Sequence, residues 1–265
     1  MQKPAEPCPF VEITPGAPVE TARHGWRAKC LQRLIRLDMP VPRTISLPTE
    51  TVRAIAAGQV LETPRLAECF GAHPLVAVRP SPANPEWGGP GTILNIGMNT
   101  ARHAALTQTH GAAIADAIYL RFIQTYAIHV ARLDPDMFSA APSAPTLAAA
   151  LAAYEAETDD PFPQSPERQL AEVLRSMARA WEGTTARLLR QAKGAPAEAP
   201  LGLIVQEMVL STGPGFCGSG TIQFVEPVTG VPQITGRFRG QTIGRNVTQD
   251  MLYLTRDPRG ASLEE

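Results

Sequence analysis

The sequence lacks several features that mark common classes of protein. Its four cysteines form no Cys-x-x-Cys pair and no cysteine–histidine cluster at metal-ligand spacing (Cys8, Cys30, Cys69 and Cys217). In a chain of 265 residues, such isolated cysteines are typical of reduced thiols. No apolar run reaches the roughly 18 residues that a membrane span needs, and the N-terminal segment has no apolar core of a signal peptide. We therefore expect a cytoplasmic protein with no membrane partner.

An excess of charge of either sign is also absent. Lysine and arginine number 24 against 25 aspartates and glutamates, and no basic run stands out. Proteins that hold nucleic acid mainly by releasing counterions need such an excess, so no nucleic-acid partner is expected. The five histidines show no ligand spacing. The length is sufficient for one large domain or two small ones.

The hydrophobic pattern predicts a succession of helices and strands. A helix is expected before Pro40, a short strand and a helix over 43–58 with Thr49 or Thr51 as its N-cap, and buried strands at 74–80 and 92–99. Residues 103–134 form an alanine-rich helical region in which Ile118, Phe122 and Tyr126 are spaced as one buried face. A strongly amphipathic helix is expected to begin near Pro166.

Beyond the linker at 193–200, apolar alternation with glycine and proline is typical of strands. A mixed N-terminal part, a helical stretch and a β-rich end together predict an α+β fold with two lobes.

Five collinear segments carry a family resemblance: "RAKCLQRLIRLDMPVPRTISLPTE", "PLVAVRPSPANPEWGGPGTILNIGMN", "YLRFIQTYAIHVARLDPDMF", "FPQSPERQLAEVLRSMARAWEGTTARLLRQ", and "IVQEMV" with the later "GSGTIQFVEPVTG" and "GRFRGQTIGRNV". In order and spacing they resemble the N-terminal nucleotide-binding domain of the pyruvate phosphate dikinase family, an ATP-grasp fold. The resemblance implies an ATP-grasp lobe at 1–100, a helical subdomain at 101–195 and a β-rich lobe at 196–265. The family's phosphohistidine domain and its pyruvate-binding barrel have no counterpart in these 265 residues.

The resemblance implies a phosphate site in the second of these segments. Gly88, Gly89, Gly91 and Thr92 match the family loop that closes over the ATP phosphates, where backbone N–H groups bind anions. Arg79 matches the family arginine, a bidentate phosphate donor. By residue type alone, a salt bridge is the favoured explanation of an arginine at a strand end, and the resemblance makes phosphate binding an equal alternative.

Other positions of the implied site are retained only in part. Arg27 stands where the family has a lysine, and Trp26 replaces the glycine before it, so the charge is kept but its shape changes. Gln206 and Glu207 match the strand that lines the adenine side of the cleft.

The implied metal site departs furthest from the family. Arg237 and Arg245 occupy positions where the family has glutamates that hold Mg²⁺, and Asn246 replaces an aspartate. Because Mg²⁺ needs anionic oxygen ligands, no conventional Mg·ATP site is expected. Glu226 and Asp250 lie nearby in sequence, but their spacing does not identify them as substitutes.

Three functions follow from these observations. The resemblance implies an ATP-binding, kinase-type phosphotransferase domain, and the lost acidic ligands predict that its catalysis is impaired or lost, so no catalytic residue is assigned. A second hypothesis is a non-catalytic partner of a full-length dikinase that carries the missing domains. In a third, Arg27, Arg79, Arg237 and Arg245 converge on a phosphorylated or carboxylated metabolite without a metal.

Overall fold

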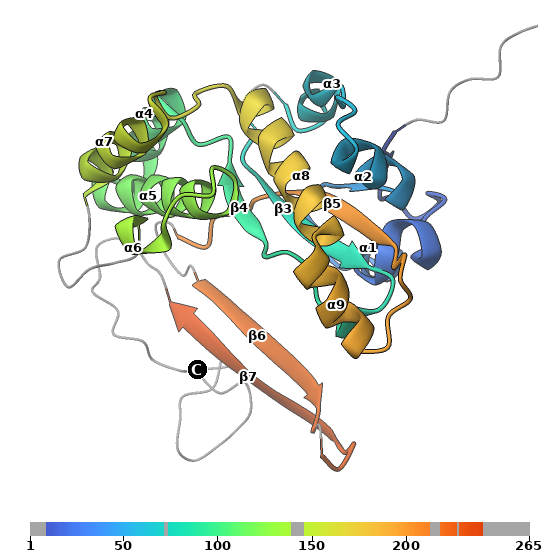
Figure 1. Ribbon diagram of the computed structural model, residues 1–265. Coiled ribbons are helices and arrows are strands. Elements are labelled where there is room, and N and C mark those ends of the chain that lie inside the picture. Colours follow the sequence, from blue (N-terminus) through green and yellow to red (C-terminus); the bar gives the residue numbers. More distant parts are fainter. Residues whose placement is uncertain (1–8, 72–73, 139–145, 213–217, 227, 241–265) are drawn as a thin grey trace, which may run out of the picture. The chain divides into compact units, whose positions relative to one another are not determined.

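The computed structural model describes residues 9–71, 74–138, 146–212, 218–226 and 228–240. Helices and strands are mixed along the chain, which confirms the predicted α+β class. The chain divides into two compact units (Figure 1). The main unit comprises residues 1–107 and 112–208, and the second unit comprises residues 108–111 and 209–265.

A five-stranded sheet forms the centre of the main unit. Its strands are β1 (Val11–Glu12), β2 (Thr44–Leu47), β3 (Val76–Pro82), β4 (Ile93–Ile96) and β5 (Leu201–Glu207). They lie in the order β1-β2-β5-β3-β4, and each neighbouring pair is antiparallel. The strands expected around residues 44, 76, 93 and 201 are therefore confirmed.

Strand β5 links the end of the main unit to its beginning. It hydrogen-bonds to β2 on one side and to β3 on the other, with Gln206 opposite both Thr44 and Ala77. The resemblance placed the start of a C-terminal lobe at residue 196, ahead of this strand. The two compact units instead divide after Met208, because the backbone hydrogen bonds of β5 belong to the first sheet.

Helices α1 (Thr21–Arg36), α2 (Thr49–Ala56) and α8 (Pro166–Glu182) pack on the sheet, and α3 (Thr63–Glu68) and α9 (Thr184–Ala192) pack against α8. Between α3 and α8 lie the one-turn 3₁₀ helix η1 (Pro85–Trp87) and helices α4 (Thr100–His110), α5 (Ala112–His129), α6 (Pro135–Phe138) and α7 (Leu147–Thr158). The described residues contain no helix that is both long and apolar enough to cross a membrane.

The expected threonine cap of α2 was wrong. Pro48 occupies the N-cap position, and Thr49 and Thr51 lie inside the helix. Their hydroxyls donate to carbonyls of other segments, Thr49 to Arg23 and Thr51 to Pro9. Both threonines therefore tie α2 to its neighbours, which sequence periodicity could not reveal.

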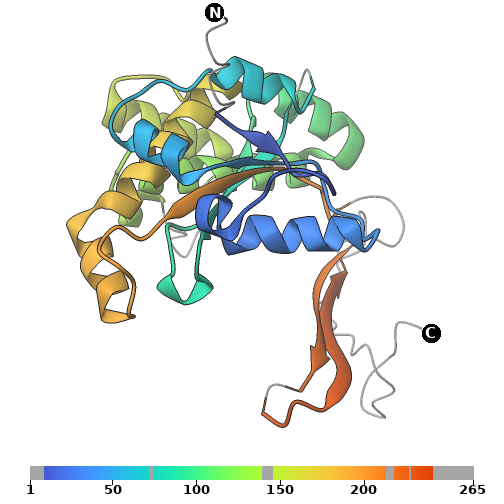
Figure 2. The ribbon, with the colours of Figure 1, turned by 90° about the vertical axis from the view of Figure 1, so that its right-hand side faces the viewer.

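The two faces of the sheet are covered differently, as Figure 2 shows. Helix α1 lies on one face, where Ile204 packs with Ile13, Val19 and Ala28. The other face faces α2 and α8, and its side chains are almost entirely apolar and buried (Ile45, Leu47, Val78, Leu203 and Val205). Because side chains alternate along a strand, the polar residues of β2 and β3 gather on the α1 face together with Gln206 of β5.

Helices α5 and α7 pack around a cluster of aromatic rings. Phe122 and Tyr126 are buried as predicted, whereas Ile118 is only half-buried and Tyr119 takes its place in the core. Phe162 contacts the rings of Tyr119, Phe122 and Tyr126 at 5.2–6.0 Å between centroids. The predicted amphipathic helix is α8, with Pro166 as its first residue.

The second unit contains an antiparallel pair of strands, β6 (Gly218–Val225) and β7 (Pro232–Gly240). Glu226 stabilises the turn between them, since its carboxylate accepts hydrogen bonds from the backbone N–H groups of Val228 and Thr229 at 3.2 and 2.6 Å. A hydrogen bond from the Thr229 side chain and, after it, these two backbone hydrogen bonds lower the pKa of Glu226.

Candidate functional site

Arg27 and Arg79 lie close together on the α1 face of the sheet. Arg27 comes from the first half of α1, and Arg79 from the middle of β3, opposite Ile204 of β5. Both are half-buried. Burial and, after it, the charge of Arg79 lower the pKa of Arg27. Two of the predicted phosphate-binding residues are therefore brought together by the fold.

This arginine pair has no acidic partner within the described part of the chain. The ion pairs there use other arginines and one histidine, and neither Arg27 nor Arg79 takes part in one. The salt-bridge explanation of Arg79 is thus not supported by the described residues. Two neighbouring cations without a carboxylate form a local excess of positive charge.

Neutral hydrogen bonds fix both guanidinium groups. The Nε of Arg27 donates to the carbonyl of Pro80 at 3.0 Å, and Nη1 of Arg79 donates to Oε1 of Gln206 at 3.1 Å. Gln206 in turn donates from Nε2 to the hydroxyl of Thr44 at 2.9 Å. A guanidinium carries five N–H donors, and among the described contacts each arginine uses one of them as a donor, so the others are available to a ligand.

The backbone of α1 approaches β3 closely at Gly25, next to the arginine pair. Gly25 has φ +81°, and a Cβ placed there would lie 1.7 Å from the carbonyl oxygen of Ser81. The Ser81 hydroxyl accepts a hydrogen bond from the N–H of Ala28 at 3.2 Å. Gly25 and Ser81 thus position Arg27, a role that the sequence analysis missed. The available signal was a glycine at the start of the helix expected before Pro40, a residue type that permits close backbone approach.

The glycine-rich loop follows β3 and projects beyond the sheet (Figure 2). Gly88 has φ +76°, and a Cβ on Gly89 would come within 3.1 Å of Pro80 and 3.9 Å of the Trp181 ring. Gly88 and Gly89 are exposed, as are the two other predicted loop residues, Gly91 and Thr92. Among the described contacts, none of these four hydrogen-bonds to either arginine of the pair, so phosphate binding by the loop stays a prediction.

The remaining predicted residues fall into two groups. Gln206 accepts a hydrogen bond from Arg79 of the pair. Side chains alternate along β5, so Glu207 lies on the opposite face of the sheet, where it is exposed. Arg237 lies on β7 opposite Thr221, in the second unit. Arg245, with Asn246 and Asp250, lies outside the described residues.

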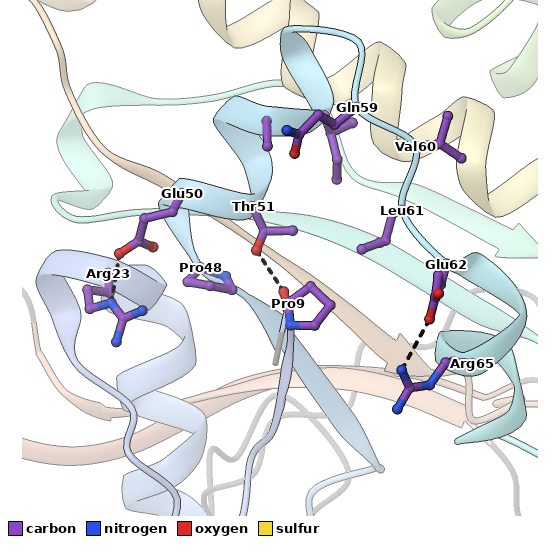
Figure 3. A pocket seen from close by; sticks show the side chains of 12 residues that line it. Pro9, Arg23, Pro48, Glu50, Thr51, Gln59, Val60, Leu61, Glu62 and Arg65 are labelled. Atoms are coloured by element: carbon purple, nitrogen blue, oxygen red, sulfur yellow. Dashed lines mark hydrogen bonds and ion pairs between the residues drawn. The ribbon is translucent and has the colours of Figure 1, made fainter. Parts of the chain in front are cut away.

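A cavity of about 660 Å³ lies elsewhere in the main unit, between α1, α2 and residues 59–65 (Figure 3). Its charged lining residues neutralise one another, Arg23 with Glu50 at 2.9 Å and Arg65 with Glu62 at 3.1 Å. It shares no residue with the arginine pair. Because its charged side chains are already paired with one another, this cavity offers a charged ligand fewer free partners than the Arg27–Arg79 pair does.

A scan against models of protein families gives no match for this chain, and a search of curated proteins gives none either. Within the described residues, no group of three histidine, cysteine, aspartate or glutamate side chains is arranged to hold a metal ion. The Mg²⁺ that the resemblance implies does not fit the residues present, because arginines stand at 237 and 245, where the resemblance would place glutamates. The chemistry of the site therefore rests on guanidinium groups.

Proposed function

We propose that the main unit binds the phosphate chain of ATP through Arg27 and Arg79, as a degenerate ATP-grasp domain of pyruvate phosphate dikinase type. The observation that carries the proposal is the pair itself: two half-buried guanidinium groups side by side, without a carboxylate among the described residues. An anion between them would remove their mutual repulsion.

The hydrogen bonds of the pair support a phosphate ligand. Arg27 and Arg79 are each held by one neutral acceptor, so their orientation is fixed before a ligand arrives. Guanidinium groups bind phosphate oxygens through parallel N–H bonds that are stronger than neutral ones. Prior fixation reduces the entropy that binding would otherwise cost.

Phosphotransfer is proposed to be impaired or lost. The family's carboxylate positions hold Arg237 and Arg245, and a guanidinium cannot bind Mg²⁺. These substitutions favour one second candidate, a metal-independent binder of another phosphorylated metabolite. Both candidates use Arg27 and Arg79, and they differ in whether the adenosine part of ATP contributes to affinity.

Calorimetric titration with ATP, with and without Mg²⁺, tests the proposal. Arg27→Gln and Arg79→Gln should each weaken ATP binding by about 10- to 100-fold, the loss expected for one charged hydrogen-bonding group. Arg36→Gln is the matched control, since Arg36 lies on the same helix and its Nε also donates to a backbone carbonyl, that of Pro15. This control should bind ATP like the unmodified chain.

Each outcome decides between the candidates. ATP binding that weakens in both site variants, with inorganic triphosphate binding clearly less well, supports the nucleotide site. Equal affinity for ATP and triphosphate, independent of Mg²⁺, supports the metabolite binder instead. Absence of binding by ATP and by triphosphate would refute both.

A further inference from the structure

A second cavity of the main unit, of about 450 Å³, lies where α2, the end of α8, α9 and residues 197–199 meet. It shares no residue with the Arg27–Arg79 pair. Its lining consists of five charged residues and four alanines (Arg53, Glu182, Arg187, Arg190 and Glu198; Ala56, Ala57, Ala197 and Ala199). Volumes of this size are common for small-molecule sites.

Arg190 is the unusual member of this lining. It is only 4% exposed, and its Nε is buried without a hydrogen-bond partner in the described structure. Both glutamates of the cavity are engaged by other arginines, Glu182 by Arg187 at 3.2 Å and Glu198 by Arg53 at 3.6 Å. Within the described residues Arg190 thus forms no ion pair of its own, and the charge of Glu182, which is already paired with Arg187, offsets its buried charge only in part. A buried cation in this position is a costly arrangement in a folded protein.

Two contacts with Trp181 hold Arg190 in place. Its guanidinium carbon lies 3.6 Å from the centre of the indole ring, and Nη1 donates to the Trp181 carbonyl at 2.6 Å. The indole N–H itself donates to the carbonyl of Ala199 at 3.0 Å. Burial lowers the pKa of Arg190, yet a guanidinium stays charged in proteins. The cation is thus fixed at the cavity wall.

We propose that this cavity binds a small organic anion whose carboxylate or phosphate group pairs with Arg190. Arg53 and Arg187 add positive charge to the lining, and three arginines against two glutamates leave one net positive charge for the anion to neutralise. The alanines provide an apolar wall for a short carbon skeleton. This inference is independent of the proposed ATP site.

Trp181 provides a direct readout of this cavity. The chain has three tryptophans, so a Trp26→Phe, Trp87→Phe variant leaves Trp181, which contacts Arg190 of the cavity wall, as the single tryptophan. Inorganic phosphate and succinate are titrated separately, with sodium chloride at matched ionic strength. We expect a saturable fluorescence change with phosphate, succinate or both, and the stronger ligand identifies the group that the cavity prefers. Chloride should give no saturable change.

Paired variants of the exposed charges test the site without disturbing the buried Arg190. The double variant Arg53→Gln, Arg187→Gln should lower the affinity for the anion by about two- to fivefold, because the lining loses positive charge. The double variant Glu182→Gln, Glu198→Gln should raise the affinity for the anion by a similar factor, because two competing carboxylates are removed. Opposite shifts in the two variants cannot arise from a general loss of folding.

The result that would overturn the proposal is equally direct. If neither anion changes the Trp181 signal beyond the chloride control at concentrations on the order of 10 mM, in the reporter chain and in its Glu182→Gln, Glu198→Gln form, the cavity binds no such ligand. Placing Arg79→Gln in the same reporter should leave the titration unchanged. A loss of signal in that variant would assign the response to the Arg27–Arg79 pair and refute the second site.

Discussion

Gly25→Ala tests the contact that positions Arg27 between α1 and β3. The new Cβ would lie 1.7 Å from the Ser81 carbonyl oxygen, and the backbone at φ +81° and ψ 171° is a conformation that side chains strongly disfavour. That conformation alone costs about 1–3 kcal/mol in a residue other than glycine. Because the close atom belongs to the backbone of β3, no side chain can turn away to relieve the contact.

Helix α1 must therefore move away from strand β3. Two hydrogen bonds depend on the close approach of these two elements. These run from Ala28 N to the Ser81 hydroxyl and from Arg27 Nε to the Pro80 carbonyl. Each contributes about 0.5–1.5 kcal/mol. We expect Gly25→Ala to lower the free energy of unfolding by about 4 kcal/mol, a large share of the usual 5–15 kcal/mol.

Urea denaturation followed by circular dichroism measures this loss, with Gly16→Ala as the control. Gly16 is exposed and has no atom within 4 Å of an added Cβ, so its substitution should leave the unfolding midpoint nearly unchanged. A loss below about 1 kcal/mol in Gly25→Ala, comparable to a surface substitution, would refute the close approach of α1 to β3. The same Gly25→Ala variant should also weaken ATP binding, because Arg27 is displaced.

Two further predictions concern stability. Burial, and then the charge of Arg23, lower the pKa of His24 in the folded state, so folding favours its neutral ring and stability should fall as the pH drops below the ordinary value of 6.5. Unfolding midpoints above and below that pH measure the effect, which His24→Gln should reduce; an unchanged profile would contradict the buried neutral histidine. Ser165→Ala removes the N-cap of α8, whose hydroxyl accepts from Arg168 N at 3.1 Å, and should cost about 1 kcal/mol in urea denaturation. A loss no larger than that of the exposed Thr185→Ala would contradict the cap.

The sequence predicted local structure well because helix and strand formation depends largely on periodic burial and on turn residues. The strands around Val76 and Leu201 and the amphipathic helix after Pro166 all lie where the pattern placed them. The cap of α2 was wrong because the hydroxyls of Thr49 and Thr51 bond to distant carbonyls. Such partners are set by packing and leave no mark in the local pattern.

Residue type and the family resemblance predicted which side chains could bind an anion, among them Arg27 and Arg79. Only the tertiary structure decided that they meet, because β5 brings Gln206 between β2 and β3 and Gly25 lets α1 approach Ser81. Nothing in the sequence distinguished the buried Arg190 from the other arginines on amphipathic helices. Glu182 pairs with Arg187 and Glu198 pairs with Arg53, so neither forms an ion pair with Arg190 in the described structure. These pairings depend on distances in the folded chain.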